Sequence, residues 1–197
     1  MKRSIVLFLI GSACAATLFA ADPVTRRDAA RLQAKIDRIN KLAGTRTPSG
    51  TRTAVTETEL NSYLQFELAD RIPAGVKDPW VSMVGDGRVS GTATVDLGQV
   101  AQSRKSGGMF DPFNLLSGSL PLTVNGILKT GNGVGSFSLE SASISGVPVP
   151  AWMLQEIVSY YSKSPSSPQG VSIDKPFVLP SGIREIQLDR GQAIVVQ

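Results

Sequence analysis

The chain has 197 residues, no histidine, one cysteine and a formal net charge of +4. Without histidine it lacks the usual general base and the commonest zinc ligand, and one cysteine cannot build a disulfide framework. These counts disfavour histidine-dependent hydrolases, zinc enzymes and disulfide-stapled domains. We therefore predict that the protein is not an enzyme and has no catalytic residues, no metal site and no cofactor.

The first residues have the three parts of a secretory signal peptide. Lys2 and Arg3 are positively charged, an apolar run follows from Ile5 to Ile10, and small residues continue to Ala21. This order is typical of a segment removed after export, and the run is short for a membrane span of about 20 residues. We predict an exported protein, periplasmic or otherwise extracytoplasmic, with residues 1–21 as the signal peptide; a retained membrane anchor is the alternative.

Positive charge is concentrated in the next segment. Residues 26–52 hold eight Lys or Arg against two Asp or Glu, whereas residues 53–197 hold ten against thirteen. Within residues 25–43, apolar side chains recur at helical spacing and form a narrow stripe, and residues 45–53 have the Thr, Ser, Gly and Pro content of a linker. We predict a basic helical arm and linker over 22–54 and a single domain over 55–197, and we expect the arm to be dispensable for the fold of that domain.

The basic arm has two interpretations. Its cations are either a solvated helix face or a surface attracted to an anionic membrane or an acidic protein partner. A nucleic acid partner is not expected for an exported protein.

Two further helices are predicted inside the domain. Thr56 and Glu59 have the spacing of a capping box, and the helix that follows carries an apolar face of Leu60, Tyr63, Leu64 and Leu68. A later helix begins after Pro150, a residue suited to a helix start. Its apolar face consists of Met153, Leu154, Ile157, Val158 and Tyr161.

Most of the remaining domain has the alternating pattern of strands. From Trp80 apolar residues recur with a period of two, and glycine-containing turns at 85–87, 131–133 and 189–191 separate the strands into hairpins. The apolar parity changes near Glu140 and Ser141, which predicts a β-bulge. About six strands joined mainly by hairpins indicate an antiparallel α+β fold.

The segment 106–117 combines large apolar side chains with glycines. Met109, Phe110 and Phe113 lie there, after two glycines and beside Asp111-Pro112. Such residues form either a lid or membrane-touching tip, or a turn that plugs the end of the core. Trp152 has the same ambiguity between core wedge and interfacial aromatic.

Three short motifs resemble the tubular lipid-binding (TULIP) superfamily, in particular its small single-module members in bacterial envelopes. They are a helix opening at 56–64, a strand, turn and helix at 144–154, and the segment 177–183 before the last hairpin. The resemblance covers about residues 55–197. It implies a curled antiparallel sheet wrapped on a long helix, with an apolar groove that accepts the acyl chains of phospholipid or another lipid.

The family type has no catalytic residues, and its ligand contacts are scattered apolar side chains that do not map one by one. The candidate ligand contacts therefore come from the patterns of this chain: Leu64, Leu68, Met109, Phe110, Phe113, Trp152, Leu154 and Ile157. The small residues Gly91, Ala93, Gly126 and Ala142 on predicted strands either leave space for a ligand or accommodate a closely packed helix. The sequence thus predicts a lipid-binding or lipid-carrying module of the cell envelope, with an envelope assembly or scaffold protein acting through protein contacts as the alternative.

Overall fold

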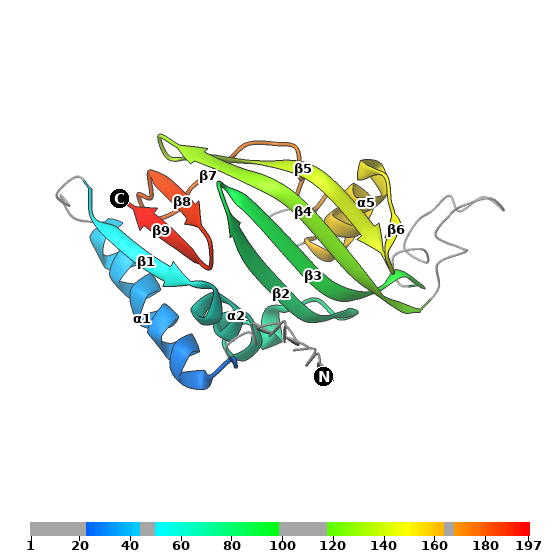
Figure 1. Cartoon of the computed structure of the whole chain (residues 1–197), viewed down its shortest axis with the longest axis horizontal. Coiled ribbons are helices and arrows are strands. Elements are labelled where there is room, and N and C mark those ends of the chain that lie inside the picture. The colour runs from blue at the N-terminus through cyan, green and yellow to red at the C-terminus, as the bar shows by residue number, and fades with distance from the viewer. Residues whose placement is uncertain (1–22, 44–49, 99–117, 164–167) are drawn as a thin grey trace, which may run out of the picture.

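The computed structural model describes residues 23–43, 50–98, 118–163 and 168–197. Within these ranges the chain forms helices and two antiparallel sheets, which confirms the α+β class (Figure 1). The helices are α1 (Arg26–Ala43), α2 (Glu57–Phe66), the 3-10 turn η1 (Ala69–Arg71) and α5 (Ala151–Tyr161). The strands are β1 (Arg52–Thr56), β2 (Val76–Gly85), β3 (Arg88–Asp96), β4 (Ser119–Gly131), β5 (Val134–Ile144), β6 (Val147–Pro148), β7 (Phe177–Val178), β8 (Glu185–Asp189) and β9 (Gln192–Val196).

The larger sheet has six strands in the order β2-β3-β4-β5-β6, with β7 also paired to β5. Its two long hairpins turn at residues with positive φ, Asp86 (54°) with Gly87 (76°) and Asn132 (52°) with Gly133 (80°). Two successive left-handed residues make the tight turn that matches the twist of paired strands. Both predicted turns are therefore confirmed.

The predicted β-bulge is also confirmed. Asn125 of β4 pairs with Ser141 of β5, but the next residue, Gly126, pairs with Leu139, so Glu140 is the extra residue. The apolar side chains on both sides of the bulge thus keep the same face of the sheet, as the change of parity predicts.

The last predicted hairpin does not join the larger sheet. β8 and β9 form a separate three-stranded sheet in which β9 pairs with β1, so that Ala54 lies opposite Ile194. The predicted boundary between arm and domain at residue 54 therefore falls inside a strand, and the predicted linker overlaps the start of that strand.

Polar side chains of α2 hold the outer edge of β2. The Asn61 side chain donates to the Val81 carbonyl (2.7 Å) and accepts from the Val81 amide (2.8 Å). A Glu57 carboxylate oxygen accepts from the Met83 amide (2.7 Å), and the Gly191 amide donates to the Met83 carbonyl (2.8 Å). Because buried backbone groups need partners, these contacts replace a neighbouring strand and fix α2 against the sheet. Asn61 is fully buried as a result.

Helix α5 covers the other end of the six-stranded sheet (Figure 1). Its residues Met153, Leu154 and Ile157 are buried against β3, β4 and β5, which confirms the predicted apolar face of this helix. We call this set of buried residues the α5 cluster: Val95, Leu97, Leu122, Ala142, Ile144, Met153, Leu154 and Ile157. In the described ranges, no helix is both long and apolar enough to span a bilayer.

Candidate functional site

An apolar groove lies between α1, α2 and the three-stranded sheet. It encloses about 340 Å³. Asn40, Ser181 and Tyr63 are the polar residues among those that line it, and the other lining side chains are apolar. We call it the α1–α2 groove, and its apolar lining is Leu32, Ile36, Ile39, Val55, Leu60, Leu64, Leu68, Pro180, Ile183 and Val195.

Leu60, Tyr63 and Leu64 of α2 line this groove, whereas the buried residues of α2 are polar. Glu59, Asn61 and Ser62 are buried, while Leu60 and Leu64 are only partly covered. The sequence pattern alone assigned the apolar residues to the buried face. The buried face of α2 is polar instead because hydrogen bonds hold this helix on both sides, to β2 on one side and to α1 on the other.

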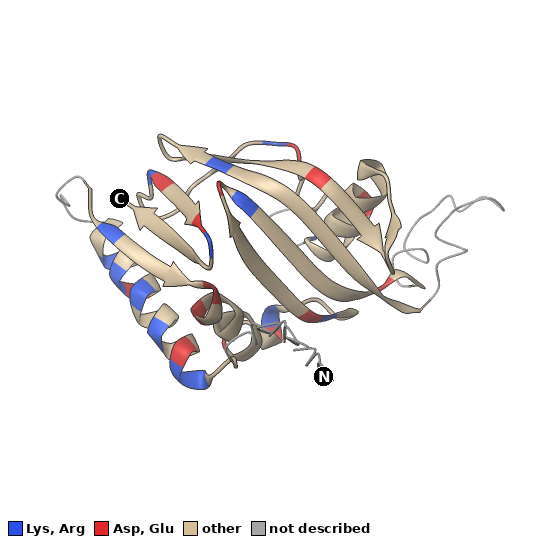
Figure 2. Ribbon diagram, viewed as in Figure 1, with Lys and Arg blue, Asp and Glu red and all other residues tan. Residues whose placement is uncertain are grey.

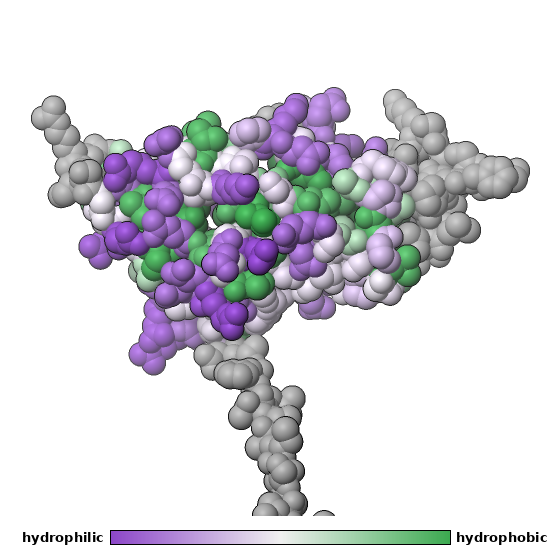
Figure 3. Space-filling model, turned by 45° about the horizontal axis from the view of Figure 1, so that its top comes forward, coloured by the Kyte–Doolittle hydropathy of each residue, from purple (hydrophilic) through white to green (hydrophobic). Residues whose placement is uncertain are grey.

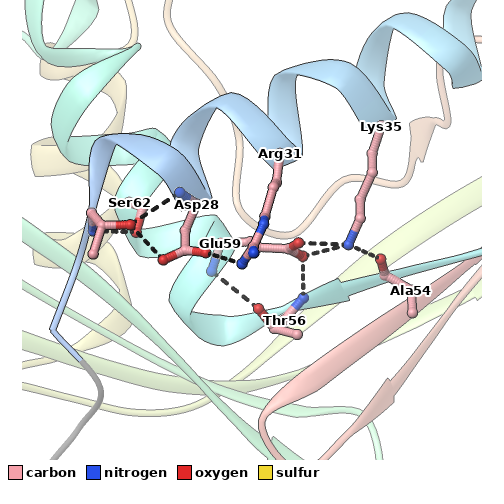
Figure 4. A network of polar contacts seen from close by, with 8 residues as sticks. Asp28, Arg31, Lys35, Ala54, Thr56, Glu59 and Ser62 are labelled. Atoms are coloured by element: carbon pink, nitrogen blue, oxygen red, sulfur yellow. Dashed lines mark hydrogen bonds and ion pairs between the residues drawn. The ribbon is translucent and has the colours of Figure 1, made fainter.

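Polar contacts join α1 to α2 (Figure 4). The Lys35 ammonium lies 2.6 Å from a Glu59 carboxylate oxygen and donates to the Ala54 carbonyl (2.7 Å). At the start of α1, the Thr25 amide donates to the Ser62 hydroxyl (3.1 Å). These contacts set the distance between the two helices, so the apolar side chains beside them need not meet to hold the pair together.

Glu59 serves both helices at once. Its carboxylate accepts from the Thr56 amide (2.9 Å), and the Thr56 hydroxyl accepts from the Glu59 amide (3.1 Å). This is the capping box that the sequence predicts, and it is confirmed. Because the same carboxylate binds Lys35, the cap of α2 also anchors α1.

One end of the groove carries hydrogen-bonding side chains. The Ser181 hydroxyl donates to the Asn40 side-chain oxygen (2.6 Å), and the Gln197 side-chain nitrogen donates to the carbonyls of Ile39 (3.0 Å) and Ser181 (2.8 Å). Ser181 has a φ of +55°, which a non-glycine residue adopts at a cost. The hydrogen bonds offset that cost and fix residues 180–183 against the end of α1.

Charge is unevenly distributed around the groove. Blue ribbon segments, which mark Lys and Arg, recur along α1, while the six-stranded sheet has few charged positions (Figure 2). Near the start of α1, the hydrogen bond from the Thr25 hydroxyl, assisted by Arg31, holds the pKa of Asp28 below its usual value. On the face drawn in Figure 3, hydrophobic patches lie between hydrophilic side chains.

The structure separates the predicted ligand contacts into two places. Leu64 and Leu68 line the α1–α2 groove. Leu154 and Ile157 belong to the α5 cluster and are 1% and 2% exposed, so they are core residues in this structure. Trp152 is 49% exposed. Met109, Phe110 and Phe113 lie outside the described residues.

The small residues of the large sheet fall into different environments. A Cβ on Gly126 would clash with the Phe137 ring, which covers this glycine, and Ala142 is buried in the α5 cluster. Around Gly91, by contrast, a Cβ would meet no atom within 4 Å. The same sequence feature therefore marks close packing at two positions and open space at the third.

Several residues of the groove are not among the ligand contacts that the sequence predicts. Ile36 and Ile39 lie in the segment that the sequence predicts as a separate arm. Val55 lies where the second helix is predicted to begin, and Ile183 and Val195 lie in the predicted last hairpin. Their periodicity predicts which face of each element is apolar, but the meeting of these faces depends on the pairing of β1 with β9.

No family model, no curated protein and no solved structure matches the chain.

Proposed function

We propose that this protein is an exported, non-catalytic module of the bacterial cell envelope that binds an acyl chain in the α1–α2 groove. The observation that carries the proposal is the groove itself, a space of about 340 Å³ walled almost entirely by aliphatic side chains. Protein interiors normally fill such space, and an apolar pocket with a few polar groups is typical of a ligand site.

The size and polarity of the groove favour one class of ligand. Small-molecule sites enclose about 300–1,000 Å³, so this groove is at the lower end and suits a single chain better than a bulky or branched molecule. The polar end at Asn40 and Ser181 can meet a hydrogen-bonding head, while Leu60, Leu64 and Leu68 contact a hydrocarbon tail.

The proposal includes export and the curled shape implied by the TULIP resemblance. The N-terminal pattern of residues 1–21 supports export. Bulges bend strands, and the register shifts in β2 and at Glu140 of β5 therefore support curvature of the larger sheet round its helical side.

A groove-filling substitution tests the proposal. Leu64→Trp places a large ring in the groove, whereas Gln65→Trp adds the same ring at an exposed neighbouring position of α2. We expect Leu64→Trp to lower the affinity for a fluorescent long-chain fatty acid at least tenfold, with Gln65→Trp close to wild type. Native mass spectrometry of detergent-free protein should show bound lipid in wild type and less in Leu64→Trp. Equal binding by both variants, or a wild-type protein that binds no probe, would refute the proposal.

A further inference from the structure

The outward face of α1 carries a one-sided stripe of positive charge. Arg27, Arg31, Arg38 and Lys41 are exposed and follow one another at spacings of four, seven and three residues, which places them on one side of a helix. The opposite side holds the buried residues Ala29, Leu32 and Ile39. We call the four cations the α1 stripe.

The acidic residues of α1 lie off this stripe. The Asp28 carboxylate accepts from the Thr25 hydroxyl and forms an ion pair with Arg31 of the stripe (2.6 Å), beside the contact with α2. Asp37 accepts from Gln33 (2.8 Å), and Gln33 in turn accepts from the Tyr63 hydroxyl of the groove wall (3.1 Å). Lys35 forms an ion pair with Glu59 of α2. The stripe therefore presents positive charge outward with carboxylates only on its flanks.

We propose that the α1 stripe docks the protein on an anionic lipid surface. The stripe runs from residue 27 to 41, which is about 21 Å along a straight helix. Helix α1, with its Lys and Arg positions in blue, lies along one outer edge of the molecule (Figure 2). A straight line of cations fits a planar anionic surface, to which each Lys or Arg is attracted. Residues 53–197 are net negative, so the excess of positive charge that attracts such a surface comes from the segment that contains α1.

The position of the stripe relates the contact with the lipid surface to the groove. This step of the inference rests on the proposed function. The stripe and the groove lie on different sides of the same helix, because Ile36, Ile39 and Asn40 of α1 line the groove. A protein held on the membrane through this helix keeps the groove beside the lipid from which an acyl chain would come.

Vesicle co-sedimentation tests the inference with a charge-matched control. The stripe variant carries Arg27→Gln, Arg31→Gln, Arg38→Gln and Lys41→Gln. The control removes the same charge at exposed sites elsewhere, with the substitutions Lys77→Gln, Lys129→Gln, Lys175→Gln and Arg190→Gln. We expect wild type to bind vesicles containing one third phosphatidylglycerol, to ignore pure phosphatidylcholine, and to dissociate as salt increases.

At roughly fivefold per cation near the surface, the stripe variant should lose several hundredfold in vesicle affinity while the control stays within a few fold of wild type. Equal losses in both variants, or a wild type that does not bind anionic vesicles, would overturn the inference. The fatty acid probe separates this from the groove: the stripe variant should bind the probe normally in solution, and Leu64→Trp should still bind vesicles.

Discussion

The α5 cluster and the α1–α2 groove are built from the same kinds of side chain, but only the cluster is closed. Leu154 and Ile144 of the cluster are each 1% exposed. In the groove, Leu32 and Ile39 are buried as well, but Ile36, Leu60 and Leu64 are only half-buried. An apolar stripe on a helix therefore does not decide by itself whether a core or a cavity results.

The two regions differ in what holds their helices. Helix α5 is placed by its apolar side chains, which pack directly on the sheet. Helix α1 also buries the apolar side chains Leu32 and Ile39, but polar contacts join α1 to α2 and α2 to the larger sheet, namely Lys35 with Glu59, Thr25 with Ser62, and Asn61 with β2. Polar contacts at fixed distances can hold two helices while the apolar surface beside them stays open, which is the arrangement a ligand site needs.

The largest effect is expected for a charge in the closed region. Leu154→Asp puts a carboxylate at a position that is 1% exposed and has no basic side chain in its cluster. A buried unpaired charge costs several kcal/mol against a total stability of about 5–15 kcal/mol, so we expect loss of cooperative thermal unfolding. Ala151→Asp on the exposed first turn of the same helix should melt like wild type. If Leu154→Asp melts at the same temperature as wild type, the assignment of this face of α5 to the core is wrong.

A smaller but still large effect is expected when α1 is removed. The composition suggests a dispensable arm, whereas α1 buries Ala29, Leu32 and Ile39. Burying a Leu or Ile side chain contributes about 1.5–3 kcal/mol, and one kcal/mol corresponds to about 2–4 °C for a domain of this size. Deleting residues 23–49 should therefore lower the melting temperature by roughly 10–20 °C in calorimetry. If the melting temperature falls by only a few degrees, the prediction that the arm is dispensable for the fold is correct.

The features that the sequence predicts correctly are local. The capping box of Thr56 and Glu59, the turns at residues 86–87 and 132–133, and the bulge at Glu140 each depend on residues within a few positions. Such signals act through backbone geometry that neighbouring residues determine. The same holds for the apolar face of α5, because its period of 3.6 is clear.

The features that the sequence does not reveal depend on distant partners. β1 pairs with β9 about 140 residues later, and its short Thr- and Val-containing stretch resembles the end of a linker. Buried Asn61 and Ser62 look like surface residues until β2 and Thr25 supply their partners. The groove combines both cases, so Leu64 and Leu68 could be named as candidates but their neighbours on α1 and β9 could not.

An intermediate effect is expected when the polar link between α1 and α2 is cut. Glu59 is 6% exposed, and Lys35→Met leaves its carboxylate without a counter-charge. An unsatisfied buried group costs about 1–3 kcal/mol, which urea denaturation can measure. Arg38→Met, at an exposed position of the same helix, should change stability by less than about 0.5 kcal/mol. If both variants are equally stable, apolar packing rather than this ion pair positions α1.

The smallest effect concerns a hydroxyl beside the closed region. The Tyr161 hydroxyl donates to the Asp96 carbonyl (2.8 Å), and burial, followed by the nearby Asp96 charge, raises the pKa of Tyr161 above 10.0. Below pH 10 the phenol is protonated in both folded and unfolded chains, so its contribution to stability is fully present. As the pH rises past 10, the unfolded chain loses this proton first, and the contribution is lost progressively through the folded-state pKa.

Tyr161→Phe should therefore lose about 1 kcal/mol at neutral pH, the value of one hydrogen bond, and fall less steeply than wild type above pH 10. Urea midpoints measured from pH 7 to 11 test this, and below pH 9 the two curves should run parallel because this group does not titrate there. The alkaline slope separates ionisation of the phenol from simple loss of packing, since a packing defect lowers both ends of the curve equally. Parallel curves up to pH 11 would show that ionisation of the phenol does not affect stability and that Tyr161 holds the end of α5 by apolar packing of its ring, as the aliphatic side chains of Leu154 and Ile157 hold the helix by apolar packing.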